Sequence, residues 1–96
     1  MIEIRKTTLA ESDLEEIWLY SFQEWGETQA DKYHDHLTHA IEQLGHNPQL
    51  GKPCDHVRSG YRMFQAERHT IYYQHLSDHL KIIRVLHERM EPTKHL

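Results

Sequence analysis

The chain has 96 residues, enough for one domain with a small core but not for two. Its hydrophobic fraction of 38% is typical of a folded water-soluble chain, and no stretch approaches the roughly 18 consecutive apolar residues of a membrane span. The net charge of −4 is unevenly spread, because residues 1–50 carry −7 and residues 51–96 carry +3. This predicts an acidic helical layer and a second half whose cations are either scattered or form a basic partner-binding surface.

The first residues predict a short strand followed by an amphipathic helix. Residues 2–5 alternate apolar and polar, the period of a half-buried strand. Because this start lacks the apolar region of a signal peptide, we expect a cytoplasmic protein. Thr8 to Glu11 fits a helix-capping box, and Gly26 can end the helix in a left-handed conformation. The apolar side chains between them recur at helical spacing and predict one stripe: Leu14, Ile17, Trp18, Phe22 and Trp25.

A second helix is predicted to begin directly after Gly26. Thr28 and Asp31 can cap its first turn, and Asn47-Pro48 is expected to stop it. Two amphipathic helices joined by so few residues must fold back on each other as an antiparallel hairpin. The apolar face of the second helix repeats every three or four residues: Ala30, Tyr33, Leu37, Ile41 and Leu44.

The remaining half predicts a loop and three strands. Residues 47–57 contain two prolines and a glycine and are expected to form a connection. Strand candidates at 58–65, 69–76 and 80–87 follow, separated by short polar turns, which predicts an antiparallel meander. The order of one strand, two helices and three strands predicts a single α+β domain over residues 1–96, with the helical hairpin packed on an antiparallel sheet.

Histidine is the most unusual component, with ten in the chain. His36 and His39 could share a helix face near His34, but no HExxH or paired Cys/His pattern completes a zinc site. Surface histidines are the preferred interpretation, and we expect no metal or other cofactor. The lone Cys54 excludes an intramolecular disulfide and is expected to be a buried, inert thiol.

RNA cleavage is the one catalytic alternative, and it needs phosphate-binding cations beside a general acid or base. Tyr61, Tyr72 and Tyr73 could also form a stacking platform for nucleic acid. However, strand tyrosines usually pack against helices, and overall acidity argues against tight phosphate binding. Five side chains on or beside the strands could supply the cations and the acid or base: Arg58, Arg62, Arg68, Arg84 and His87.

Several segments resemble the ParE toxins of bacterial toxin–antitoxin modules. In the first half these are Ile17-Trp18 to Trp25-Gly26, Gln29-Ala30 with Tyr33, and the stretch NPQLGKP at 47–53. In the second half they are RSGYR at 58–62, Phe64, HTIYY at 69–73 and IRVLHERM at 83–90. The resemblance covers nearly the whole chain, and its Gly-Tyr-Arg and Arg-Val-Leu-His parts are the most specific.

The resemblance implies a RelE-like fold, poisoning of DNA gyrase by binding rather than catalysis, and neutralisation by a ParD-like antitoxin. RelE-type ribosome-dependent nucleases share the fold but are rich in Lys and Arg where this chain has Met63, Phe64 and Gln65. A related nuclease would have His-Tyr where this chain has His87-Glu88, and an acid there would repel phosphate. The set of residues that such a nuclease needs is therefore incomplete, and direct sequence-specific nucleic-acid binding is not expected.

The groove between the hairpin and the sheet is the expected antitoxin site, with aromatic and Met anchors and with arginines facing an acidic tail. The candidates are Trp18, Trp25, Tyr33, Arg58, Tyr61, Arg62, Arg84, Arg89 and Met90. The polar C-terminal segment is expected to contact gyrase through Glu88, Arg89, Met90 and Lys94. Three functions stay open: a gyrase poison, a ribosome-dependent mRNA endonuclease, and a non-toxic ParE-like binding module.

Overall fold

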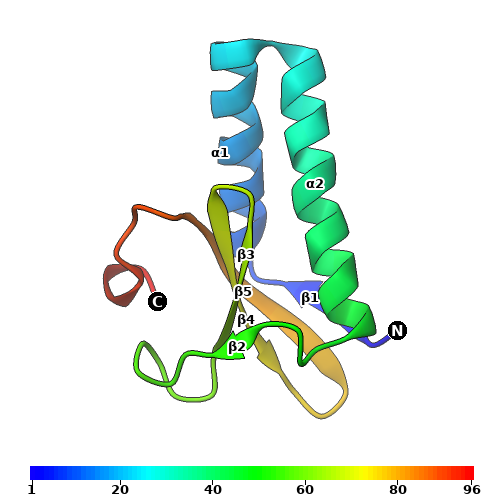
Figure 1. Ribbon diagram of the computed structural model, residues 1–96, viewed down its shortest axis with the longest axis vertical. Coiled ribbons are helices and arrows are strands. Elements are labelled where there is room, and N and C mark those ends of the chain that lie inside the picture. Colours follow the sequence, from blue (N-terminus) through cyan, green and yellow to red (C-terminus); the bar gives the residue numbers. More distant parts are fainter.

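A computed structural model describes all 96 residues and contains a helical hairpin packed on a five-stranded sheet (Figure 1). The strands lie in the order β1-β5-β4-β3-β2, so the α+β class and the predicted sequence of helices and main strands are confirmed. Neither helix is long and apolar enough to cross a bilayer. The elements in chain order are β1 (Glu3–Lys6), α1 (Thr8–Trp25), α2 (Glu27–His46), β2 (Lys52–Pro53), β3 (Arg62–Ala66), β4 (His69–His75), β5 (His79–His87) and the 3-10 helix η1 (Pro92–Lys94).

The sheet is mixed, whereas the sequence predicted a wholly antiparallel one. β1 pairs with β5 in parallel, with Ile4 opposite Leu80, and the other neighbouring strands are antiparallel. The region predicted as a loop contains a fifth strand of two residues, because Lys52 pairs with Met63 of β3. The strand expected from residue 58 begins only at Arg62, since residues 55–60 form turns.

The helix ends differ from the prediction at both N-terminal caps. Thr7 caps α1 in place of Thr8, and its Oγ1 accepts a hydrogen bond of 3.0 Å from the Ala10 N–H. Gly26 ends α1 with a φ of 88°, as predicted. The same glycine is also the N-cap of α2, so Thr28 lies inside the first turn and no side chain caps this helix.

One core joins the helices to the facing side of the sheet. The apolar stripe of α1 is only partly confirmed, because Leu14 is buried whereas Phe22 is 43% and Trp25 is 63% exposed. Figure 1 shows the reason, since the closed end of the helical hairpin extends beyond the sheet. The stripe of α2 lies over the sheet, and four of its five predicted members are fully or almost fully buried: Ala30, Leu37, Ile41 and Leu44.

A second, smaller apolar cluster lies on the opposite face of the sheet. Cys54 is fully buried there beside Tyr72 and Leu86, and Leu96 packs against them. Burial raises the pKa of the Cys54 thiol, so the thiol stays protonated at neutral pH, and the prediction of a buried cysteine is confirmed. Tyr72 and Tyr73 are successive residues of β4, so only Tyr73 reaches the main core.

The hydroxyl of Tyr73 and the guanidinium of Arg62 fix the segment that enters β2. Tyr73 Oη accepts from the Gly51 N–H at 3.0 Å and donates to the Pro48 carbonyl at 2.7 Å. Arg62 donates to the Gly51 carbonyl through Nη2 at 2.6 Å and through Nε at 3.0 Å. The stretch NPQLGKP and the Gly-Tyr-Arg segment therefore contact each other. These contacts, here called the clamp, use the Arg62 guanidinium for hydrogen bonds within the chain.

Replacing Gly51 by alanine is expected to lower the free energy of unfolding by about 1–3 kcal/mol, the usual cost of overpacking. A Cβ at Gly51 would lie 2.5 Å from Tyr73 Oη and 2.7 Å from the Met63 carbonyl, so the clamp must move. Denaturant unfolding measures the change. The exposed neighbour Leu50 is the control, and Leu50→Ala should change the unfolding free energy by less than about 0.5 kcal/mol. Equal effects of the two changes would show that the clamp is not rigid.

Candidate functional site

The main concave surface, here called the groove, lies between the helical hairpin, the β3–β4 turn and the end of β5. Its volume is about 1090 Å³. In Figure 1 the closed end of the hairpin rises past the sheet, and the β3–β4 turn reaches up beside it. The groove is thus built from segments far apart in sequence. This is why the periodicity of the sequence predicts the helices and strands that form the groove but not the residues that line it.

The wall that α1 contributes to the groove is apolar and exposed. Tyr20 is 59% and Trp25 is 63% exposed, and their rings meet edge to face with centroids 6.0 Å apart. Ile17 continues this wall toward the core, and Met90 lies in the groove just after β5. Large apolar side chains that stay exposed next to one another indicate a surface that a partner covers. Trp25 and Met90 were among the predicted antitoxin contacts, whereas Tyr20, which lies off the helical stripe, was not.

The floor of the groove holds three aromatic side chains from three elements. Tyr33 of α2 lies with its hydroxyl 2.7 Å from His69 Nδ1, and the His69 ring meets the His87 ring with centroids 5.3 Å apart. The Tyr33 hydroxyl also accepts from the Arg68 N–H at 3.1 Å, so its own proton is free to go to the imidazole. Burial, with a smaller effect of His87, lowers the pKa of His69 from 6.5 to about 4. His69 is therefore neutral at physiological pH.

The low pKa of His69 predicts an acid-sensitive fold. The unfolded chain binds a proton at His69 near pH 6.5 and the folded chain only near pH 4, so stability present above about 6.5 is lost as the pH falls toward about 4. His69→Gln keeps an acceptor for Tyr33 but cannot titrate. The free energy of unfolding, measured by urea at several pH values, should fall more steeply for the wild type than for this variant. Identical pH profiles would contradict the assignment.

Arg84, a candidate antitoxin contact, is held within the protein. Its guanidinium donates through Nε and Nη2 to the two carboxylate oxygens of Asp13, each at 2.8 Å, and Asp13 also accepts from the Val85 N–H at 3.0 Å. The side chains are only 16% and 10% exposed. β1 stops at Lys6, opposite Ile82. Beyond that point the Asp13 carboxylate accepts the β5 backbone hydrogen bond that a neighbouring strand would otherwise accept. Asp13 was not among the predicted site residues.

Three cations line the groove with their charges largely free. Lys32 and Arg89 make no side-chain hydrogen bond or ion pair, and the Arg68 guanidinium has only a long contact of 3.8 Å with Glu88. The groove also contains Glu16, and Glu67, whose carboxylate lies 3.2 Å from His36 Nδ1. The free positive charges therefore lie beside the apolar wall, which suits an acidic amphipathic segment. Lys32 and Arg68 were not among the predicted antitoxin contacts.

The other predicted antitoxin contacts lie away from the groove. Arg58 donates to the Leu96 carbonyl at 3.0 Å, and Tyr61 packs against the apolar cluster on the opposite face of the sheet. Trp18 lies between the helices, outside the groove, with its indole bonded to Asp31 at 2.9 Å. The predicted set is therefore split, and the groove contains five of its nine members: Trp25, Tyr33, Arg84, Arg89 and Met90.

The C-terminal segment, expected to contact gyrase, is anchored to the domain. Leu96 packs on the cluster of the opposite sheet face, and Arg84 Nη1 donates to the His95 carbonyl at 3.1 Å. Glu88 accepts from Gln65 Nε2 at 3.0 Å. The side chain of Lys94, on η1, is exposed and makes no hydrogen bond.

The chain matches the family model described as the ParE toxin of the type II toxin–antitoxin system parDE over residues 4–92. It is 40% identical to Toxin ParE1 of Mycobacterium tuberculosis over 88 residues, which cover 91% of this chain and 90% of that protein. It is 38% identical to Toxin ParE1 of Caulobacter vibrioides over 92 residues, 96% of this chain and 95% of that protein.

Structural comparison supports the same fold. A solved structure of a chromosomal ParDE toxin–antitoxin system from P. aeruginosa superposes with a TM-score of 0.80. The match covers 91% of this chain and 96% of that one at 20% sequence identity. Together with the family match over residues 4–92, these likenesses establish that the chain belongs to the ParE toxin family of type II toxin–antitoxin systems.

Proposed function

We propose that residues 1–96 form a single toxin domain that acts in the cytoplasm by binding and poisoning DNA gyrase, and that a ParD-like antitoxin neutralises it by filling the groove. The observation that carries the antitoxin part is the exposed wall of Tyr20 and Trp25 beside the free cations Lys32, Arg68 and Arg89. An amphipathic acidic segment bound in the groove would bury the aromatic wall with its apolar face and pair with the cations through its carboxylates.

The chemistry of the groove favours binding over RNA cleavage. A nuclease needs cations that are free to hold phosphate and a group poised to move a proton. Here Arg84 is neutralised by Asp13, and His69 is bonded to Tyr33 with its pKa lowered to about 4. His87 accepts from the Arg89 N–H at 3.1 Å, and the neighbouring Glu88 adds negative charge where phosphate would lie. These contacts support a toxin that acts as a ligand.

Within this proposal, Glu88, Arg89, Met90 and Lys94 are the gyrase contacts. Arg89 and Met90 also line the groove, so an antitoxin that fills the groove would cover part of the gyrase-binding surface. Neutralisation then follows from steric exclusion. Deleting the segment is a poor test, because loss of Leu96 uncovers Cys54, Tyr72 and Leu86. The charge reversal Lys94→Glu alters an exposed side chain and leaves that cluster covered.

Expression of the chain without its antitoxin separates the three candidate functions. A gyrase poison is expected to arrest growth and induce the DNA-damage response while bulk mRNA stays intact. Rapid mRNA cleavage with normal gyrase activity would instead favour the ribosome-dependent nuclease. Normal growth with retained antitoxin binding would identify a non-toxic binding module. Co-expression of the ParD-like antitoxin is the control, and it should restore growth in the first two cases.

A further inference from the structure

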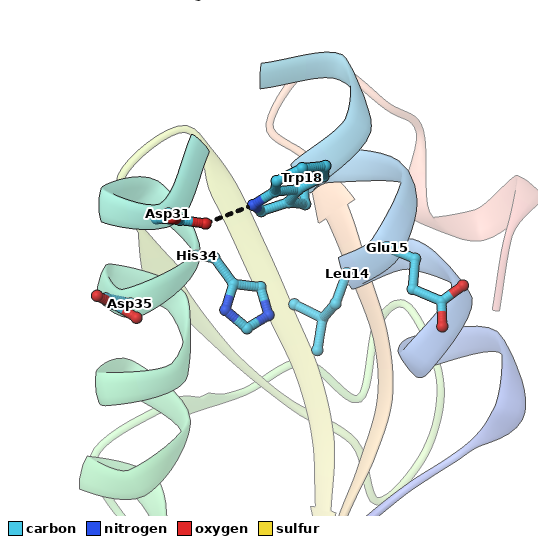
Figure 2. A pocket seen from close by; sticks show the side chains of 6 residues that line it. All are labelled: Leu14, Glu15, Trp18, Asp31, His34 and Asp35. Carbon is cyan, nitrogen blue, oxygen red and sulfur yellow. Dashed lines mark hydrogen bonds between the residues drawn. The ribbon is translucent and has the colours of Figure 1, made fainter. Parts of the chain in front are cut away.

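A second concave surface, here called the slot, lies between α1 and α2. Its volume is about 510 Å³, and it shares no lining residue with the groove. In Figure 2, Leu14 and His34 point into the space between the helices, and Glu15 and Asp35 lie at its two outer rims. The slot and the groove use different sides of each helix, so a partner in one leaves the other open. Its six lining residues are Leu14, Glu15, Trp18, Asp31, His34 and Asp35.

An aromatic ring in a fixed orientation forms one wall of the slot. The indole Nε1 of Trp18 donates to Asp31 Oδ1 at 2.9 Å, a bond that joins the two helices (Figure 2). The ring of Phe22 packs against Trp18 with centroids 5.2 Å apart and is itself 43% exposed. A tryptophan held at both its polar and its apolar edge is a preorganised surface for a cation or an aliphatic chain.

The charges around this ring are negative and unsatisfied. The carboxylates of Glu15 and Asp35 make no hydrogen bond or ion pair within the chain, and Asp31 uses one oxygen for Trp18. Asp31 and Asp35 are one helical turn apart, a spacing at which like charges repel. Helix α1 contains no Lys or Arg, so the chain supplies no mobile cation from that helix. A positive group from outside would relieve the repulsion and also lie against the indole.

We propose that the slot receives an arginine or lysine side chain presented by the protein target of the toxin. The aliphatic part of such a side chain lies against Leu14 and Trp18, and the carboxylates of Glu15 and Asp35 on the two rims attract its positive charge. The charge complementarity favours a basic segment of a protein over an acidic segment, which belongs in the groove. This inference rests on the proposed function in assigning the groove to the antitoxin and toxicity to a protein target.

Titration with a small cation tests the slot without any partner. Trp18 and Trp25 are the only tryptophans, and each gives its own indole N–H signal in a nitrogen–proton correlation spectrum. N-acetyl-arginine amide should shift the Trp18 signal and leave that of Trp25, on the groove side, in place. The uncharged analogue N-acetyl-citrulline amide should shift the Trp18 signal about fivefold less. No Trp18 shift, or equal shifts with both compounds, would overturn the proposal.

Charge reversal in the slot tests its use by the target. The double variant Glu15→Lys, Asp35→Lys should lose toxicity at least about tenfold, measured as the inducer concentration that arrests growth, while its antitoxin affinity stays within about twofold. Glu11→Lys, Glu42→Lys is the matched control on the same two helices, and it should retain toxicity. Full toxicity of the slot variant would refute the target assignment and leave the proposed function standing. If the wild type proves non-toxic, the proposed function fails, and the Trp18 titration still decides whether the slot binds a cation.

Discussion

Asp13→Ala is expected to lower the free energy of unfolding by about 3–5 kcal/mol, the usual cost of removing one partner from a buried ion pair. The change leaves the Arg84 guanidinium without its bidentate partner and the Val85 N–H without an acceptor at the edge of β5. Because the total stability of a domain is only about 5–15 kcal/mol, this loss is a large fraction of it. Urea unfolding followed by circular dichroism measures the effect.

Two further variants test whether the loss of stability comes from breaking the Asp13–Arg84 ion pair. Glu24→Ala, an exposed acidic side chain on the same helix, should change the unfolding free energy by less than about 0.5 kcal/mol. The double change Asp13→Leu, Arg84→Met replaces both ions by apolar groups and should recover part of the loss. An Asp13→Ala protein less than about 1 kcal/mol below the wild type would mean that the pair is not the link between α1 and β5.

Trp25→Ala and Tyr20→Ala should each weaken binding of the ParD-like antitoxin by about 30-fold, because buried interface aromatics are typically worth about 2 kcal/mol. Both side chains are more than half exposed in the free chain, so their loss should leave stability nearly unchanged. Isothermal titration calorimetry gives the dissociation constants, and thermal unfolding gives the stability check.

Leu9→Ala is the matched control for this pair of changes. Leu9 is 57% exposed on the same helix but lies outside the groove, so its removal should leave antitoxin affinity unchanged. If Leu9→Ala weakens binding as much as Trp25→Ala, the antitoxin lies along a different face of α1.

Reversal of Lys32 or Arg89 to Glu should weaken antitoxin binding more at low salt than at high salt, because salt screens the attraction between the charges.

The helices and main strands could be predicted because their information is local. The spacing of Ala30, Leu37, Ile41 and Leu44 and the positive φ required at Gly26 depend on near neighbours alone. The two-residue strand β2 could not, since Lys52 becomes a strand only by pairing with Met63 eleven residues later. The parallel pairing of β1 with β5 is likewise a property of the whole chain path.

The site was harder to predict than the fold because one residue type, such as arginine, can either bond within the chain or stay free to bind a partner. Arg58, Arg62 and Arg84 were grouped as partner contacts, yet each donates to a group of its own chain. Nothing in their local sequence distinguishes them from Arg89, whose guanidinium is free. Asp13 has the same signature as the exposed acids around it, and only the crossing of α1 over the end of β5 buries it. The segments most specific to the family therefore encode structure as much as function.

A supercoiling assay with purified DNA gyrase shows whether the chain poisons this enzyme. Addition of the purified chain should inhibit supercoiling and accumulate cleaved plasmid, and prior addition of the ParD-like antitoxin should abolish both effects. The Trp25→Ala protein should still inhibit gyrase but escape the antitoxin at concentrations that silence the wild type. Gyrase that supercoils normally in the presence of excess folded chain would contradict the account.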